Sequence, residues 1–313
     1  MNTVIIGLGF TQVLLPIALI AANTLIPSAS RFGLGLRSGA LFLLLIYAAL
    51  AGLWLFPPWW TPYLFMGLLM IGAIFRYGRI RHATHRWIRR TEQTAAALAL
   101  VGAALVLVPA LQGRSAPDDT VDLAMPVGPG RYLVLNGGTT DPINAHLFTL
   151  TAETARAYRG QSYAIDIIGI DRFGLRADGI SPVDPTAYQI YGTPVRAPCT
   201  GTIVQRIDGV ADMPVPVMDR ENMTGNSVMI DCDGYVVLLA HLAANSIAVE
   251  LGQSVQTGTL IGQVGNSGNT GEPHLHIHVQ SALPDDDPIS ANPLWFTLDG
   301  QFFVRNDRFT VDE

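Results

Sequence analysis

Long apolar runs occupy the first third of the chain, whereas short apolar segments broken by turns occupy the rest. Four runs with almost no charge cover about residues 4–22, 39–56, 62–75 and 95–111. A helix needs about 20 apolar residues to cross a hydrocarbon core of about 30 Å, so the third run is short for a span. A soluble bundle is the alternative, but such runs leave too little polar surface to face water. The pattern therefore predicts a four-helix transmembrane region over residues 1–113.

Arginine placement predicts how this region is oriented. The loop between the third and fourth runs holds six arginines: Arg76, Arg79, Arg81, Arg86, Arg89 and Arg90. The PPWWTP loop before the third run holds none. Positively charged loops stay on the cytoplasmic side of a membrane. We therefore expect a multi-pass protein embedded in a lipid bilayer, with the residues after about 113 on the extracytoplasmic side.

The pattern changes after a polar linker at about residues 114–125. Short apolar segments separated by Gly, Pro, Asn and Asp follow, among them RYLVLN (131–136), YAIDIIGI (163–170) and YVVLLAHL (235–242). Such segments, bounded by turn residues, are typical of antiparallel strands. The sequence thus predicts an all-β domain with an antiparallel sheet over residues 126–313.

The charge distribution supports this division into two parts. Residues 1–115 contain nine arginines and one acidic residue, a net charge of about +8, and the remainder contains ten arginines and 24 acidic residues, about −14. We expect His82 and His85 in the basic loop to be solvated or to contact lipid headgroups, and we expect no nucleic-acid partner. The chain has no lysine.

Both cysteines, Cys199 and Cys232, fall in the β domain. A pair of cysteines in an oxidising compartment often forms a disulfide. Two separate buried thiols are the alternative, because the sequence does not give their distance. We expect the disulfide.

Three histidines alternate with aliphatic residues in the segment HLHIHV, as His274, His276 and His278. This period of two is that of a β-strand, so the imidazoles share one face and the aliphatic residues pack on the other. Neighbours on one face lie roughly 6.5–7 Å apart, so the strand can supply one ligand to a metal and one neighbour of its bound water. A solvated strand face is the alternative.

The β domain contains only two further histidines, His146 and His241, and an acidic residue, Asp166, within an apolar strand. A buried carboxylate without a partner is costly, so a cation or a hydrogen-bond donor should lie beside Asp166.

These segments resemble the lysostaphin-like, LytM-type zinc endopeptidases, which cut peptides in bacterial cell walls. The resemblance covers about residues 130–300 and is carried by YAIDI, TPVRAPCTGTIV, GNSVMIDCDG, LLAHL and, most specifically, SVQTGTLIGQVGNSGNTGEPHLHIHV. The family's usual His-x-x-x-Asp motif fails here, because Ser162 stands four residues before Asp166. A subgroup of the family takes this histidine from an upstream Asn-x-His, which corresponds to Asn144 and His146.

The resemblance implies the roles of the site residues. His146, Asp166 and His276 would ligate Zn²⁺, while His241 and His274 would handle the proton and the oxyanion. His278 replaces a residue that is commonly Gln or Glu in the family, and we expect it to line the cleft or to hold a hydrogen bond behind the ligands. The resemblance also implies a barrel-sandwich-hybrid-like fold, a peptidoglycan peptide as substrate, and the bacterial cytoplasmic (inner) membrane as location.

Other functions remain to be weighed. The segments VRAPCTGTIV and GQSVQTGTLIGQVG also resemble lipoyl and biotinyl carriers, but a carrier needs a lysine to bear its prosthetic group, and the chain has none. The stronger rival is a catalytically inactive module that binds the cell wall and regulates another hydrolase. We expect the insertion at residues 208–226 to border the substrate groove, because loops around a rigid sheet carry recognition. The sequence leaves open whether a regulatory membrane partner exists.

Overall fold

The computed structural model describes residues 3–80, 85–281 and 289–312. The chain divides into two compact units, Met1–Gln112 and Gly113–Glu313. Arg81 and His82 of the predicted basic loop lie outside the described residues.

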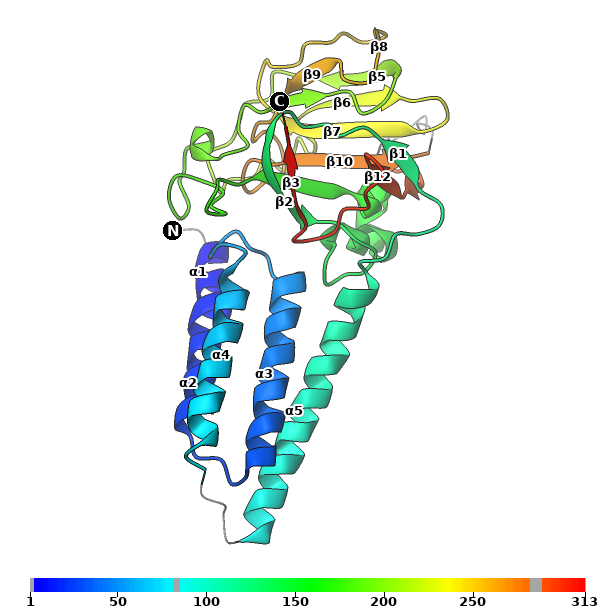
Figure 1. Cartoon of the computed structure of the whole chain (residues 1–313). Helices are drawn as coiled ribbons and strands as arrows, with labels where there is room; N and C mark the ends of the chain where they lie inside the picture. The colour runs from blue at the N-terminus through cyan, green and yellow to red at the C-terminus, as the bar shows by residue number, and fades with distance from the viewer. Residues whose placement is uncertain (1–2, 81–84, 282–288, 313) are drawn as a thin grey trace. The chain divides into compact units, whose positions relative to one another are not determined.

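The first unit consists of helices (Figure 1). They are α1 (Thr3–Gly9), the π-helical turn η1 (Phe10–Leu14), α2 (Leu15–Leu25), α3 (Arg31–Ala51), α4 (Thr61–Tyr77) and α5 (Arg86–Gln112). The helix α3 begins ahead of the apolar run at 39–56, because the side chain of Ser30 caps it by accepting a hydrogen bond from the amide of Gly33. The helix α5 likewise includes the polar residues before the run at 95–111, which a helix accommodates.

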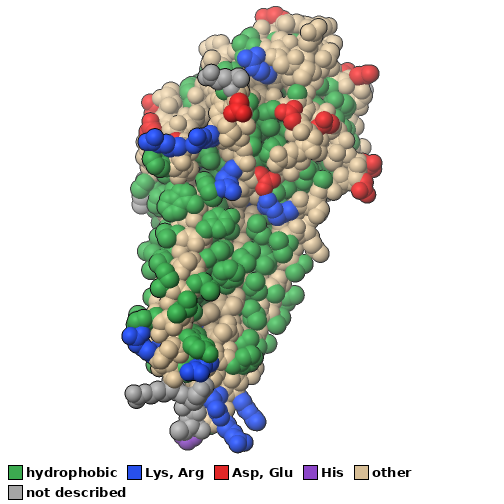
Figure 2. Space-filling model, viewed as in Figure 1, with side chains coloured by type: hydrophobic (Ala, Val, Ile, Leu, Met, Phe, Trp, Pro, Cys, Tyr) green, Lys and Arg blue, Asp and Glu red, His purple; other side chains and the backbone are tan. Residues whose placement is uncertain are grey.

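Among the described residues, three helical stretches are long and apolar enough to cross a membrane, by length and composition: Thr3–Leu25, Arg31–Ala51 and Arg86–Gln112. The helix α4 has 17 residues and is shorter than these spans. Large apolar side chains cover the outside of the helices, as Leu98 and Ile74 illustrate with exposures of 68% and 69%. Hydrophobic side chains dominate the visible face of the helices, and arginines gather at one end (Figure 2). Helices that are apolar on their outer faces suit a lipid environment, whereas the predicted count of four spans stays a prediction.

A small polar cluster ties the helices together at one end. The carboxylate of Glu92 on α5 accepts hydrogen bonds from the hydroxyl of Ser28 and the amide of Ala29, in the loop between α2 and α3. The guanidinium of Arg37 on α3 donates to the side chain of Asn23 on α2. The one acidic residue of this unit therefore has a structural role in helix packing.

The second unit is built on an antiparallel sheet, as predicted. Its strand order is β13-β2-β3-β10-β7-β6-β5-β8, and β11 pairs with β10 (Figure 1). These strands are β2 (Gly130–Asn136), β3 (Ile165–Gly169), β5 (Gly201–Ile207), β6 (Asn226–Asp231), β7 (Val236–Leu242), β8 (Ser254–Val255), β10 (Leu275–Gln280), β11 (Pro293–Leu294) and β13 (Arg308–Val311). Short helical segments follow β2, namely η2 (Ala145–Leu147), α6 (Phe148–Thr151) and η3 (Glu153–Tyr163), and η4 (Pro185–Ala187) follows β3.

Two small pairs of strands complete the unit. The strands β4 (Pro194–Arg196) and β9 (Leu260–Gln263) pair antiparallel, and β1 (Val121–Leu123) and β12 (Phe296–Leu298) pair parallel. The strand β1 lies inside the segment that the sequence analysis took for a linker, residues 114–125. That segment is instead partly structured, since the guanidinium of Arg114 also forms an ion pair with Asp307. The barrel-sandwich detail of the fold stays a prediction.

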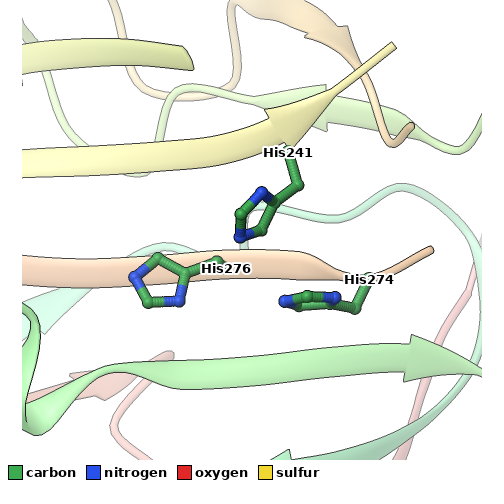
Figure 3. Close-up of side chains that lie close together, drawn as sticks. All are labelled: His241, His274 and His276. Carbon is green, nitrogen blue, oxygen red and sulfur yellow. The ribbon is translucent and has the colours of Figure 1, made fainter. Parts of the chain in front are cut away.

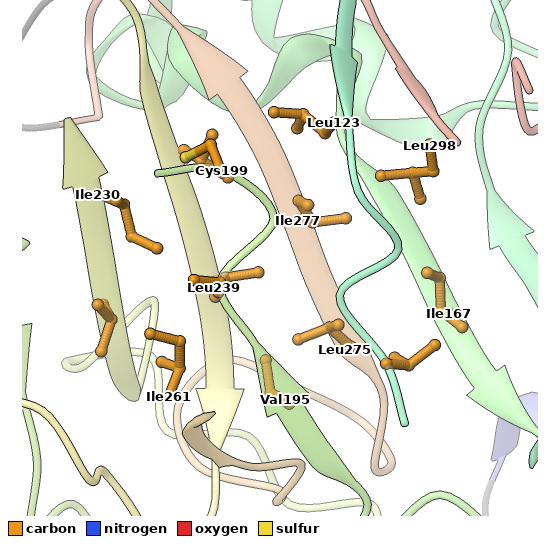
Figure 4. Packing of buried hydrophobic residues seen from close by; sticks show 14 of the residues in the cluster. Leu123, Ile167, Val195, Cys199, Ile230, Leu239, Ile261, Leu275, Ile277 and Leu298 are labelled. Atoms are coloured by element: carbon orange, nitrogen blue, oxygen red, sulfur yellow. The ribbon is translucent and has the colours of Figure 1, made fainter. Parts of the chain in front are cut away.

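The strand β10 separates the core from the polar face of the sheet. Its aliphatic residues Leu275, Ile277 and Val279 are fully buried in the main hydrophobic core, with Leu239 of β7 and Ile167 of β3 (Figure 4). Its other face carries the alternating polar side chains, of which His276 and His278 are 4% and 0% exposed. The alternation in the sequence therefore reflects a strand with two buried faces, one apolar and one polar. The histidine face is buried and is not a solvated strand face.

Cys199 and Cys232 form the predicted disulfide, with their Cα atoms 6.0 Å apart. Both half-cystines belong to the main core cluster. The bond joins the segment before β5 to the end of β6, and so it closes the β5–β6 hairpin together with the long insertion between the two strands.

Removing this disulfide should destabilise the second unit. The bridge spans 33 residues, and closing a loop of that size stabilises a fold by about 3–4 kcal/mol in the chain-entropy model. We expect the double variant Cys199→Ala/Cys232→Ala of a fragment 113–313 to unfold with a free energy lower by about that amount. Urea titration followed by fluorescence of Trp295, which stacks on Tyr163, measures the change. An unchanged free energy of unfolding would contradict the stabilising role.

Candidate active site

Three neighbouring strands bring the predicted site residues to one face of the sheet. The strand β10 lies between β3 and β7, and the register places His276 opposite Asp166 of β3 and Ala240 of β7. His241 follows Ala240 at the end of β7, and His274 immediately precedes β10. His146 comes from the short helix η2 between β2 and β3. All five residues that the sequence analysis selected therefore meet at one place.

Asp166 is the centre of this cluster. Its Oδ1 lies 2.9 Å from Nδ1 of His276 and 3.6 Å from Nε2 of His274. Its Oδ2 lies 3.4 Å from Nε2 of His146 and accepts a hydrogen bond of 2.7 Å from the side-chain amide of Asn136. The carboxylate is 6% exposed, so these partners replace the water that burial removed.

Burial shifts the pKa values in the direction that metal binding requires. Burial by itself would raise the pKa of Asp166, but the imidazoles of His146, His274 and His276 outweigh it and hold this pKa well below its usual value. Burial lowers the pKa of His146 to about 4, although Asp166 opposes the shift. Burial also lowers the pKa of His241 well below its usual value, with His274 and His276 adding to the effect. At neutral pH the site thus holds a carboxylate on Asp166 and neutral imidazoles on His146 and His241, and these are the forms that bind a metal.

His241 and His274 face each other across the end of the two strands (Figure 3). Their ring centroids lie 4.8 Å apart, and that of His241 lies 5.8 Å from His276. Nδ1 of His241 faces the carbonyl oxygen of Ser267 at 2.9 Å, and Nδ1 of His274 faces that of Glu272 at 2.9 Å. A carbonyl oxygen only accepts, so each ring carries its proton on Nδ1 and turns a basic Nε2 toward the site.

The backbone at His241 is unusual. Its φ of +63° is left-handed, and the register between β6 and β7 shifts close to it. Such a conformation is uncommon for any residue other than Gly, although His adopts it more often than most, and it costs about 1–3 kcal/mol. Its amide donates to the carbonyl of Thr224, and its carbonyl accepts from the amide of Gly265. The irregularity directs the imidazole toward His274 and His276.

Within the part of the chain that the structure describes, two groups of side chains can hold a metal ion, and His276 belongs to both. The ligand atoms of His146, Asp166 and His276 lie within 4.8 Å of one another, and so do those of His241, His274 and His276. The first group offers two imidazoles and a carboxylate, the donor set of catalytic zinc sites that keep a fourth position open. In that group Nδ1 of His146 also lies 3.1 Å from the side-chain oxygen of Asn144, which fixes the ring. The residues therefore fit a zinc ion, and the carboxylate favours the first group.

Asn136 and Arg305 are site residues that sequence reasoning missed. Asn136 donates to Asp166, and its own side-chain oxygen accepts from the guanidinium of Arg305 and, at 3.3 Å, from the amide of Ala145. Asn136 ends the apolar segment RYLVLN, and a polar residue at a strand end was the available signal. Arg305 lies far away in the sequence, and no local pattern identifies it.

A buried ion pair supports the segment that carries His274. The guanidinium of Arg176 donates to the carboxylate of Glu272 at 2.8 and 3.0 Å, and both side chains are less than a tenth exposed. The carbonyl of the same Glu272 faces His274. Nothing in the sequence pairs these two residues, which are 96 positions apart.

The cluster opens into a cleft of about 280 Å³. Its walls include Phe148, Tyr158 and Gln161 on one side, and Met223 and Thr224 of the predicted groove loop 208–226. The residues Asn269–Gly271 line it as well. Part of the insertion thus borders the cleft, as predicted.

Known proteins share this domain. Residues 186–290 match the model of Peptidase family M23. A segment of 119 residues is 32% identical to the cell division protein DipM of Caulobacter vibrioides, and it covers 38% of this chain but only 17% of that protein.

One solved structure with a similar segment is a putative peptidase M23 from Pseudomonas aeruginosa, which is 30% identical in sequence. The match covers 28% of this chain and 34% of that chain, with a TM-score of 0.22. The catalytic domain of lysostaphin from Staphylococcus simulans shows 20% identity over 40% of this chain and 71% of that chain, with a TM-score of 0.26. A zinc containing peptidase from Vibrio cholerae shows 21% identity over 42% of this chain and 48% of that chain, with a TM-score of 0.24. With TM-scores this low, the assignment depends on the sequence match.

The matched segment contains His241, His274 and His276 but neither His146 nor Asp166, so the latter two are brought to the site by the fold alone. Residues 186–290 are thus similar to the M23 peptidase family, which confirms the predicted resemblance to the LytM-type peptidases.

Proposed function

We propose that the chain is a membrane-tethered zinc metalloendopeptidase that hydrolyses peptide bonds in the cross-bridges or stems of bacterial peptidoglycan. The observation that carries this proposal is the convergence of His146, Asp166 and His276 beside His241 and His274 at the cleft of an M23 domain.

In this proposal the ion is held by His146, Asp166 and His276. Bound there, zinc supplies Lewis acidity, which polarises a carbonyl and lowers the pKa of coordinated water to about 7. The protein holds these ligands in place through Asn136, which donates to Asp166, and through Asn144, which faces His146.

The two remaining imidazoles supply the proton chemistry. Both His241 and His274 turn Nε2 toward the site, because Nδ1 of each ring faces a carbonyl. A neutral Nε2 accepts the proton of the attacking water and returns it to the leaving amine. The ring that has taken this proton is a cation, and its Nε2–H donates a hydrogen bond to the oxyanion of the tetrahedral intermediate until the proton passes to the leaving amine. Nδ1 of either ring faces a carbonyl oxygen, so we assign this proton chemistry to the two residues as a pair.

The substrate and the location complete the proposal. The M23 match and the similarity to a cell division protein support a cell-wall peptide. The three long apolar helices support anchoring in the bacterial cytoplasmic membrane. The arginine-rich loop then lies in the cytoplasm and the M23 domain outside it, where it reaches the part of the wall nearest the membrane.

An inactive module that binds the wall and regulates another hydrolase is less favoured. Loss of one ligand or one proton carrier would be enough to abolish catalysis, and all five side chains are retained within contact of one another.

Two substitutions should separate the ligand role from the proton role. In the full-length chain in detergent, His276→Ala should lose bound zinc, because His276 belongs to both candidate ligand groups. His241→Ala should keep zinc but cut cell-wall fragments about 10²–10⁴-fold more slowly, the usual contribution of a general acid or base. Metal analysis and digestion of purified wall measure the two effects.

The matched control is His85→Ala, which removes a histidine of the basic loop of the helical unit and should change neither quantity. Zinc lost from His241→Ala would contradict the proposed ligand set and would favour the group His241, His274 and His276 instead. Full cutting activity in His276→Ala would contradict zinc catalysis altogether.

The helices should be needed for location and not for catalysis. A fragment 113–313 contains every site residue in one compact unit, so it should bind one zinc ion and digest isolated peptidoglycan at a rate within about threefold of the detergent-solubilised chain. Release of soluble peptides measures the rate. A fragment that binds zinc but does not cut would show that the first unit takes part in the reaction.

A further inference from the structure

His278 is an imidazole that neither metal binding nor proton transfer uses. It lies on β10 two residues beyond His276, on the same face, and it is completely buried. Its Nδ1 lies 3.1 Å from Nε2 of His276, with the two rings nearly perpendicular at 82°. The opposite nitrogen of His276, Nδ1, lies 2.9 Å from Asp166. His276 is thus held between a carboxylate on one side and a second imidazole on the other.

These contacts fix the positions of the protons in the metal-free protein. A neutral imidazole has one N–H and one acceptor nitrogen. The carboxylate of Asp166 only accepts, so Nδ1 of His276 carries the proton and Nε2 accepts. The hydrogen bond to Nε2 then requires a donor, which is Nδ1–H of His278. Both rings therefore carry their proton on Nδ1.

Metal binding reverses this arrangement. The nitrogen of His276 that faces Asp166 is Nδ1, so Nδ1 is the nitrogen that would ligate the metal beside this carboxylate. A ligating nitrogen offers a lone pair in place of a proton. The proton of His276 must then reside on Nε2, where it needs an acceptor. Nδ1 of His278 can accept only if the proton of His278 has moved to its own Nε2. Both protons move, and the pair neither gains nor loses one.

We propose that His278 is a positioning residue for the metal site, which holds His276 in the ligating tautomer by accepting a hydrogen bond from its Nε2–H and which changes its own tautomer when the metal binds. This inference rests on the zinc site of the proposed function. It assigns a task to a residue that stands where related domains commonly carry Gln or Glu.

The surroundings of His278 suit this task. His278 is completely buried, and Nδ1 of its ring lies 3.1 Å from Nε2 of His276. The side chain of Gln280, the next residue on this face of β10, forms a hydrogen bond with His278. Aliphatic side chains fill the opposite face of the same strand. A buried imidazole costs free energy where an aliphatic residue would pack, unless it is hydrogen-bonded.

The proton positions can be observed directly. The chain has seven histidines, so the full-length protein labelled with ¹⁵N-histidine in detergent micelles gives few signals. Long-range ¹H–¹⁵N spectra at pH 8, above the ordinary histidine pKa of about 6.5, identify the protonated nitrogen of each ring. We expect His278 to change from Nδ1–H to Nε2–H when one equivalent of Zn²⁺ is added, and His85 to stay unchanged. A zinc-loaded protein in which His278 keeps its tautomer overturns the proposal, and so does a protein that binds no zinc.

Variants test the same contact by affinity. His278→Leu removes the acceptor, and loss of a group that orients a ligand weakens metal binding about 10–100-fold. His278→Gln restores an acceptor oxygen and should bind Zn²⁺ within about threefold of the unaltered protein, as measured by competition with a chromophoric chelator. Met229→Ala, which damages the neighbouring apolar cluster, should lower the melting temperature but leave the zinc Kd within about threefold.

The proposal is overturned if His278→Leu binds Zn²⁺ with unchanged affinity. It is also overturned if His278→Gln and His278→Leu lose zinc affinity equally. Should His278→Leu fail to fold, the tautomer measurement on the unaltered protein decides. Both readouts are independent of peptide cleavage. A protein that shows the tautomer change but does not cut wall peptides would contradict the proposed function and leave this inference standing.

Discussion

A carboxylate buried at the middle of a sheet is the constraint on which the site depends. Asp166 interrupts an otherwise apolar strand and is 6% exposed, and an isolated charge in such a place costs several kcal/mol. The fold answers with four side chains from three separate segments: Asn136 at the end of β2, His146 on η2, and His274 and His276 of the β10 segment. The side chains that surround this one carboxylate thus include the candidate metal ligands. A metal cation is the partner that best suits a buried carboxylate beside several imidazole nitrogens.

The two faces of β10 show how one strand serves both stability and chemistry. Leu275, Ile277 and Val279 anchor it in the core, so the opposite side chains have little freedom to move. Support continues beyond the ligands, because Arg176 pairs with Glu272 beside His274 and Arg305 orients Asn136. A site held by packing and by hydrogen bonds on every ring is preorganised, which is what electrostatic catalysis requires.

Local sequence patterns predicted many of the helices and strands. Contacts between residues far apart in the sequence could not be predicted in this way. Period-two alternation located the strand in HLHIHV, residues 274–279, and its histidine face, and apolar length located the helices. The ends of α3 and α5 differed, since a cap at Ser30 and polar helix formers extend them beyond their apolar runs. The strand β1 was missed because its partner, β12, lies at the other end of the domain. The pairs Arg176–Glu272 and Asn136–Arg305 were missed for the same reason, because their members lie far apart in the sequence and meet only once the sheet has formed.

The zinc ligand set is the central claim, because His276 belongs to two overlapping groups of side chains. X-ray absorption at the zinc edge, on the full-length protein loaded with one equivalent of Zn²⁺, distinguishes them directly. The account predicts two imidazole nitrogens and one carboxylate oxygen around the ion, at distances of about 2.0–2.2 Å, with the remaining position taken by solvent. A spectrum that requires three imidazoles and no carboxylate would contradict it.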